Sequence, residues 1–125
     1  MNEQVSISLK SYKELIVWQR AMQLVKEIYR ITSTFPPEEK FGLTNQMRRA
    51  SVSIPSNIAE GWGRSLTKNY LQFLRISRGS LYELETQLAL SVDLEFLSNS
   101  DKAEGLIVEV SKMLNTLIKK LDSSS

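Results

Sequence analysis

The sequence predicts an all-α protein, an up-down-up-down antiparallel four-helix bundle in which the second helix is kinked at a proline. Apolar residues recur at spacings of three and four along most of the chain, which is the period of one helix face. Most of the five glycines and three prolines lie at the boundaries of these periodic segments. No alternating apolar run between turn residues indicates a strand. The short connections predict that successive helices are antiparallel neighbours within a single domain, residues 1–125.

The first helix is expected at about residues 12–33. Ser11 and Glu14 have the S-x-x-E spacing of a capping box, which satisfies free N–H groups at a helix start. Phe35-Pro36-Pro37 ends the helix, because proline disfavours helical geometry in the preceding residue. Two apolar series follow the cap, namely Leu15, Trp18, Met22, Val25 and Tyr29, and Val17, Ala21, Leu24, Ile28 and Ile31. Together they form an apolar arc wider than one bundle core requires.

The second helix is expected at about residues 43–63. Its core series is Leu43, Met47, Ala50, Ile54, Ile58 and Trp62. Pro55 lies inside the series, deletes one backbone hydrogen bond and is expected to kink the helix. Ser51 and Ser53 are placed to bond the carbonyls that the proline frees. Many residues of this segment are small, so another helix can approach it closely.

The third helix is expected at about residues 66–96, after Ser65 or Thr67 as N-cap. Its predicted core series is Tyr70, Leu74, Ser77, Leu81, Leu84, Leu88 and Val92. Gly79 and Ser80 are unusual in mid-helix, where glycine costs about 1 kcal/mol relative to alanine. We expect both to pack closely against the small residues of segment 43–63.

The fourth helix is expected at about residues 101–121. Asp101 and Glu104 resemble a second capping box. Lys119 and Lys120 lie in its last turn, where cations suit the helix dipole. The predicted core series is Ala103, Leu106, Val110, Met113, Leu117 and Leu121, widened by Ile107, Leu114 and Ile118.

Four blocks of the sequence are distinctive in order and spacing: RASVSIPSNIAEG at 49–61, Gly63-Arg64, YLQFL at 70–74 and GSLYELETQL at 79–88. Over about residues 11–121 the chain closely resembles the four-helix bundle family named for reading frames in intervening sequences of bacterial 23S ribosomal RNA. The resemblance implies a left-handed bundle that assembles into a cyclic homopentamer. It does not imply a settled biochemical function. A related branch comprises accessory proteins of diversity-generating retroelements, which bind a reverse transcriptase and nucleic acid.

Composition argues against catalysis. The chain has no Cys and no His, so it lacks disulfides, thiolate chemistry, the commonest general base and the commonest metal ligand. Its serines have no histidine to activate them, and di-iron bundles need Glu-x-x-His pairs. We therefore expect no enzyme, no metal and no cofactor. No apolar run reaches the ~20 residues of a membrane span, and no signal peptide is evident at the start, so a cytoplasmic location is expected.

Positive charge is concentrated in the middle of the chain. Residues 41–80 carry six basic residues against one acidic residue, whereas residues 81–125 have a net charge of −4. On a continuous helix, Lys68, Arg75 and Arg78 lie within about 80° of one another. Such a stripe can neutralise phosphates, and the candidate nucleic-acid-binding residues are Arg48, Arg49, Arg64, Lys68, Arg75 and Arg78. In one subunit, a solvated face or salt bridges to acidic residues explain the stripe better.

The block around Pro55 permits two interpretations. Ser56, Asn57 and Glu60 could form a polar site at the kink. Alternatively, Pro55, Asn57, Glu60 and Gly61 are structural: Asn57 satisfies freed backbone groups, Glu60 pairs with a nearby Arg, and Gly61 helps to close the helix. The structural interpretation is favoured, because it explains the motif without a ligand. Tyr70 and Phe73 could stack bases, but their helical spacing is typical of core residues.

The excess apolar surface of segment 12–33 predicts a homo-oligomer, and the uneven charge favours head-to-tail contact. The number five comes only from the resemblance.

Two functions remain open. One is a nucleic-acid-associated accessory protein that contacts RNA or DNA backbone through the basic stripe. The other is a protein-interaction scaffold that presents a surface to a protein partner. Neither involves a membrane.

Overall fold

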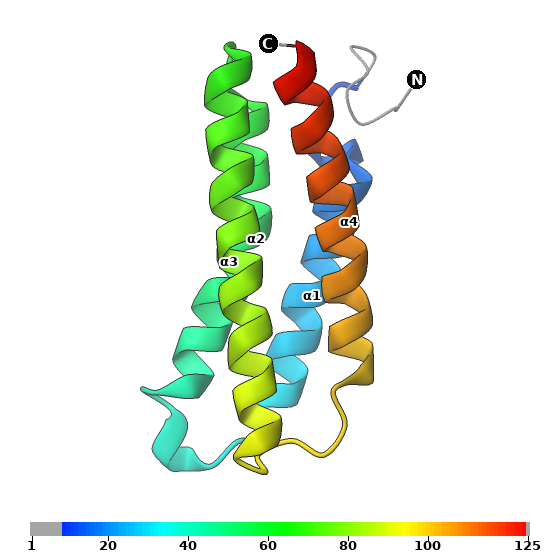
Figure 1. The fold of residues 1–125 in the computed structure, drawn as a ribbon. Coiled ribbons are helices and arrows are strands. Elements are labelled where there is room, and N and C mark those ends of the chain that lie inside the picture. Colours follow the sequence, from blue (N-terminus) through cyan, green and yellow to red (C-terminus); the bar gives the residue numbers. More distant parts are fainter. Residues whose placement is uncertain (1–8, 125) are drawn as a thin grey trace.

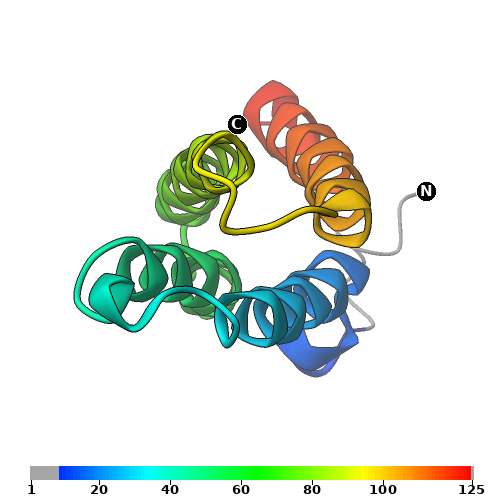
Figure 2. The same ribbon diagram turned by 90° about the horizontal axis from the view of Figure 1, so that it is seen from below.

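Four α-helices form the protein in the computed structural model, which describes residues 9–124 and has no strand in that range. They are α1 (Ile16–Thr32), α2 (Leu43–Trp62), α3 (Thr67–Asp93) and α4 (Asp101–Ser124), with short 3₁₀ turns η2 (Tyr12–Glu14) and η3 (Pro37–Glu39). The main contacts join α1 to α2, α2 to α3, α3 to α4, and α4 back to α1 (Figure 1). Seen from the end, the helices surround a common centre (Figure 2), where the buried apolar side chains form one core. The prediction of an all-α, four-helix protein is confirmed.

The core contains most of the predicted apolar positions. In α1 the core residues are those of the second series, whereas Trp18, Met22 and Val25 are half-buried and Tyr29 is exposed. In α4 the centre of the apolar stripe lies at Ile107, Leu114 and Ile118, while the predicted Leu106, Met113 and Leu121 are only half-buried. The largest fully buried side chains include Leu24, Ile28, Met47, Ile54, Ile58, Leu74, Leu84, Leu114 and Leu117.

The start of α1 differs from the prediction of a helix from residue 12. Ser11 does cap a helix, because its Oγ accepts a hydrogen bond from the Lys13 N–H at 3.1 Å, but that helix is only the turn η2. Leu15 then takes an extended conformation, with φ −70° and ψ 125°, and α1 begins at Ile16. The Leu15 side chain is completely buried, so packing of this residue accompanies the break in the helix.

The end of α3 also differs, because the helix stops at Asp93 rather than near residue 96. Glu95 has φ 65°, and the Phe96 N–H donates to the Ser91 carbonyl at 2.9 Å, which is the long hydrogen bond of a Schellman cap. The Phe96 ring packs on the Phe35 ring, with centroids 5.6 Å apart. Near this end the buried position is Ser91, whereas Val92, which was predicted to lie in the core, is 39% exposed.

The start of α4 is capped one residue earlier than predicted. The Asp101 N–H donates to Asn99 Oδ1 at 2.9 Å, and the Ser100 hydroxyl bonds the Glu104 carboxylate. Ser100 and Asn99 therefore take the capping role that the sequence suggested for Asp101. The helix continues to Ser124, past the expected end at residue 121.

The α2–α3 contact is the most extensive in the bundle. A Cβ added at Gly61 would lie 2.7 Å from Phe73 Cβ and 2.9 Å from Tyr70 Cδ1, so the α2 backbone touches α3 there. The hydroxyls of Ser53 and Ser80 lie 2.8 Å apart, as expected for close packing between the two helices. The expectation for Gly79 is wrong, because nothing lies within 4 Å of a Cβ at that position.

These two glycines predict opposite effects of the same substitution. Gly61→Ala should lower the free energy of unfolding by about 1–3 kcal/mol, because the added methyl group overlaps two α3 side chains. Gly79→Ala should raise it by up to about 1 kcal/mol, because alanine favours helix and the space is open. Urea denaturation followed by circular dichroism measures both. Equal effects of the two substitutions would contradict the close approach at Gly61.

Candidate functional site

The residues of the Pro55 motif do not form one polar site. Ser56 lines a groove between α1 and α2, whereas the Asn57 amide donates to the Ser53 carbonyl at 2.8 Å. Asn57 also donates to the Ser53 hydroxyl, which in turn contacts Ser80 of α3. The motif therefore contacts α3 through Ser53, which also accepts hydrogen bonds from Asn57, and it lines the α1/α2 groove through Ser56.

The proline-freed carbonyl is not satisfied in the way the sequence suggested. Pro55 removes the donor for the Ser51 carbonyl four residues earlier. The nearby side chains bond other carbonyls: the Ser51 hydroxyl donates to Arg48 O at 2.8 Å, and the Ser77 hydroxyl of α3 donates to Ile54 O at 2.9 Å. No side-chain hydrogen bond within residues 9–124 reaches the Ser51 carbonyl.

Glu60 and Arg64 form an ion pair at the end of α2. The Arg64 Nη2 lies 2.7 Å from the Glu60 carboxylate, and its guanidinium sits 4.9 Å from the Phe73 ring centroid. Both charged side chains are about half exposed, so water screens the pair and its contribution to stability is small. The contact nevertheless reduces the net charge that Arg64 presents to solvent.

Three more of the six candidate cations hold helices together. Arg48 Nε donates to Thr32 Oγ1 at 2.9 Å, and its guanidinium stacks on the ring of Tyr29 in α1. On α3, Arg75 pairs with a carboxylate oxygen of Asp122 in α4 at 3.3 Å. Arg78 donates to Asn115 Oδ1 of α4 at 3.0 Å. These arginines are positioned by their neighbours and do not form one free stripe.

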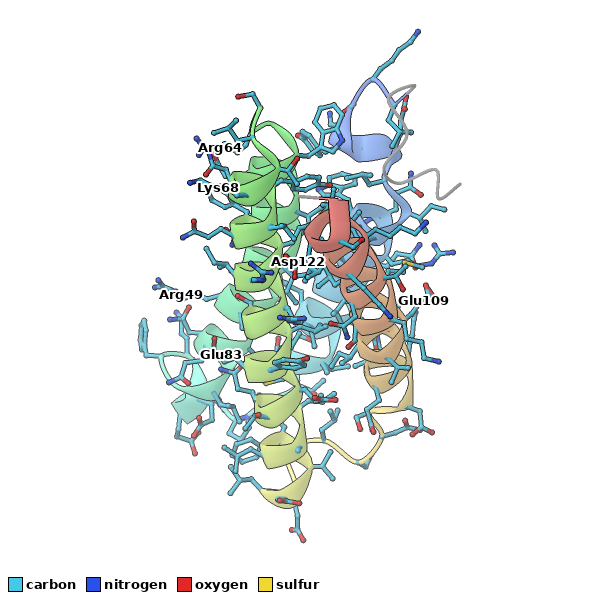
Figure 3. The ribbon with its side chains drawn as sticks, turned by 45° about the horizontal axis from the view of Figure 1, so that its top comes forward. Arg49, Arg64, Lys68, Glu83, Glu109 and Asp122 are labelled. Atoms are coloured by element: carbon cyan, nitrogen blue, oxygen red, sulfur yellow. The ribbon has the colours of Figure 1, made fainter. Side chains whose placement is uncertain are left out.

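The remaining two candidates, Arg49 and Lys68, are exposed. Within the described part of the chain neither side chain makes a hydrogen bond or ion pair. Figure 3 shows Lys68 beside Arg64 near one end of the bundle, and Arg49 further along on α2. Lys68 and Arg75 also line a shallow surface hollow on α3. Four of the six predicted cations are therefore arginines that contact other side chains, and the remaining two, Arg49 and Lys68, are free and lie apart on different helices.

Tyr70, considered above for base stacking, packs against the core. Its hydroxyl oxygen is buried and has no hydrogen-bond partner among the described residues. This burial raises the pKa of Tyr70 to about 12, because the phenolate would lose its solvation. Phe73 is half-buried beneath Arg64, so neither ring presents a free face for a base.

An apolar groove lies between α1 and α2. It encloses about 310 Å³ and is lined by Trp18, Met22 and Val25 of α1, Val52, Pro55 and Ala59 of α2, and Tyr12 of η2. Tyr12 and Trp18 make an edge-to-face ring contact, with centroids 5.4 Å apart. The α1 part of this surface was predicted from the apolar series that contains Trp18, Met22 and Val25. The α2 residues that complete the groove were not predicted from the sequence.

A buried acid was also missed by the sequence analysis. Glu27 of α1 is only 5% exposed, and Arg30 binds its carboxylate through two hydrogen bonds of 2.8 and 2.6 Å. Lys102 of α4 lies 3.9 Å away. The hydrogen bonds from Arg30 lower the pKa of Glu27 despite its burial. Arg30 of the same helix therefore satisfies the buried charge, and Lys102 adds a longer contact from α4 to α1.

Among residues 9–124, no group of three or more His, Cys, Asp or Glu side chains is arranged to hold a metal ion. No helix in this range is long and apolar enough to cross a membrane.

The family model described as "23S rRNA-intervening sequence protein" matches residues 13–116. The fold is similar to a crystal structure from Bacteroides thetaiotaomicron VPI-5482, described as a protein with unknown function from the S23 ribosomal protein family. The two chains are 23% identical with a TM-score of 0.73, and the match covers 83% of this chain and 96% of the other. No curated protein matches the sequence.

Tyr70 gives a pH-dependent prediction. Its folded pKa of about 12 lies above its ordinary value of 10.0, so the free energy of unfolding should be unaffected below pH 10 and should fall as the pH rises toward 12. Tyr70→Phe should abolish the fall in the free energy of unfolding that Tyr70 causes between pH 10 and 12. It should also remove a tyrosinate absorbance that titrates near pH 12. Denaturation across this pH range, with Tyr82→Phe as the control, measures the effect. An unchanged pH profile in Tyr70→Phe would contradict it.

Proposed function

Because this chain belongs to the 23S rRNA-intervening sequence protein family, we propose that it is a non-catalytic assembly module that associates with further copies of itself. In this proposal the bundle is a single up-down-up-down antiparallel domain, and Pro55 kinks α2. The similar solved structure is described as a protein with unknown function, and the surfaces of this chain support the proposal.

The observation that carries the proposal is the apolar groove between α1 and α2. Trp18, Met22 and Val25 point to this side of α1, and Val52 of α2 is 40% exposed beside them. An apolar surface that gathers side chains from two helices is a typical protein-interaction site. A second copy of the chain is the simplest occupant, and burial of this face would remove its aromatic and aliphatic side chains from water. The number of five subunits follows only from the family resemblance.

A nucleic-acid-associated function is the second candidate. Arg49 and Lys68 support it, because both are exposed and neither is paired within residues 9–124. In an oligomer each free cation is repeated in every subunit, which strengthens the local field. Contact would be with phosphates rather than with stacked bases, since Tyr70 and Phe73 are packed within the bundle.

Self-association can be tested with one substitution in the groove. Val52→Glu should convert the oligomer to a monomer, because it places a charge in an apolar interface while leaving the core untouched. Leu90→Glu is the matched control, since Leu90 is 45% exposed on α3 and lines neither this groove nor the hollow between α3 and α4. Light scattering at micromolar concentration measures the mass. A monomeric wild-type protein would refute the proposal, and an unchanged mass for Val52→Glu would exclude this groove as the interface.

Phosphate contact is best tested at the two free cations, because Arg75 and Arg78 bind α4 and their loss would disturb the bundle. Arg49→Glu/Lys68→Glu should weaken binding to duplex DNA in a gel-shift titration at low salt. The log–log salt slope should fall by about 0.9 for each phosphate that the variant no longer neutralises. Lys26→Glu/Lys112→Glu is the control, because it makes the same change in net charge at other surface positions and should bind as the wild type does. If the wild type does not shift the DNA, or both double variants bind alike, the two cations do not form a nucleic-acid site.

A further inference from the structure

A second hollow lies between α3 and α4. In the end view of Figure 2 this pair of helices lies on the opposite side of the bundle from α1 and α2. The hollow encloses about 320 Å³. Its apolar lining comes from both helices, with Leu88 and Ile107 reaching the core and Val92 and Val108 remaining 39% and 49% exposed. This surface was not singled out by the sequence, because Val92 was expected in the core.

The polar part of the same hollow is acidic. Glu85 and Asp93 of α3 and Glu104 of α4 line it, and no basic side chain does. The surrounding stretch, residues 83–109, contains seven acidic residues and one basic residue, Lys102. Lys102 lies 3.9 Å from the carboxylate of Glu27 on α1, so it also offsets that buried charge. Any molecule that enters the hollow therefore meets a negative field.

This combination of charge and shape restricts the occupant. Nucleic acid and anionic lipid are repelled by the carboxylates. A metal ion finds no group of three suitable ligands among residues 9–124. A cationic side chain with an aliphatic stem fits both parts of the hollow, because its stem can pack on the two valines while its charge meets the carboxylates.

We propose that the α3/α4 hollow is the docking site for a basic amphipathic segment of a partner protein. An apolar side chain of that segment enters between Leu88 and Ile107, and its lysine or arginine residues pair with Glu85 and Asp93. The proposal builds on the assembly function proposed above, because it assigns the α1/α2 groove to self-association and leaves the α3/α4 face for a different protein.

A second copy of the chain is the competing occupant. Its basic stretch is residues 41–80, but four of the six cations there are engaged within the subunit, namely Arg48, Arg64, Arg75 and Arg78. The two free ones, Arg49 and Lys68, lie on different helices. A separate segment that alternates basic and apolar residues on one helix face complements the hollow better.

The test uses the full chain and a fluorescein-labelled amphipathic peptide of leucine and lysine. Fluorescence anisotropy should show saturable binding that weakens with added salt. Glu85→Gln/Asp93→Asn should weaken binding about tenfold, because the variant removes two carboxylates that face the peptide. Glu14→Gln/Glu38→Gln, with the same change in net charge elsewhere, should bind as the wild type does. Val108→Ser should also weaken binding, which separates the apolar contribution from the charge.

Three results would overturn the proposal: equal binding by the two double variants, equal binding of a leucine–glutamate peptide, or dissociation of the oligomer by the leucine–lysine peptide. The last result would show that a second copy fills the hollow. Light scattering on the same samples keeps the two proposals distinct. A monomeric protein that still binds the peptide through Glu85 and Asp93 would refute self-association alone, whereas an oligomer that binds no peptide would refute this docking site alone.

Discussion

The close approach of α2 and α3 is the constraint on which the arrangement of the other helices depends. At Gly61 the α2 backbone meets the side chains of Tyr70 and Phe73, and no larger residue fits without a shift. About two helical turns earlier, the Ser77 hydroxyl donates to the Ile54 carbonyl, so a polar contact fixes the same pair of helices next to Pro55. Contacts at two levels set how α2 and α3 are turned relative to each other. That orientation decides which side of α2 meets α1 and which side of α3 meets α4.

Much of this architecture could be predicted because helical periodicity reports directly which face of each helix is buried. Met47 and Ile54 are examples, since their spacing alone places them in the core and both are fully buried. The ends of the helices were less predictable. Glu95 adopts a left-handed conformation that the sequence signals only when glycine or asparagine is present, and Leu15 leaves the helix although no helix-breaking residue precedes it. In both cases tertiary packing outweighs the local preference.

The residues of the candidate phosphate-binding site could be predicted from the sequence, but their positions relative to one another and their partners could not. The sequence identified six cations in one stretch, yet a long side chain selects its partner only after the fold brings that partner near. Arg75 meets Asp122, and Arg48 stacks on Tyr29, through contacts between different helices. The two long faces of the bundle differ for the same reason: the groove between α1 and α2 is lined mainly by apolar side chains, whereas the hollow between α3 and α4 is lined by apolar and acidic ones. Neither combination is visible in a single helix.

The order of contacts around the bundle has a consequence for how the chain folds. Three of the four main helix contacts join neighbours in the sequence, and only the α1–α4 contact joins the two ends. Local contacts close short loops and favour rapid folding, whereas a contact between distant segments pays a larger loop-closure entropy. We therefore expect the α2–α3 hairpin to form early and the α1–α4 contact to form last. The Arg20–Glu109 ion pair spans that final contact, so it should influence the rate of unfolding more than the rate of folding.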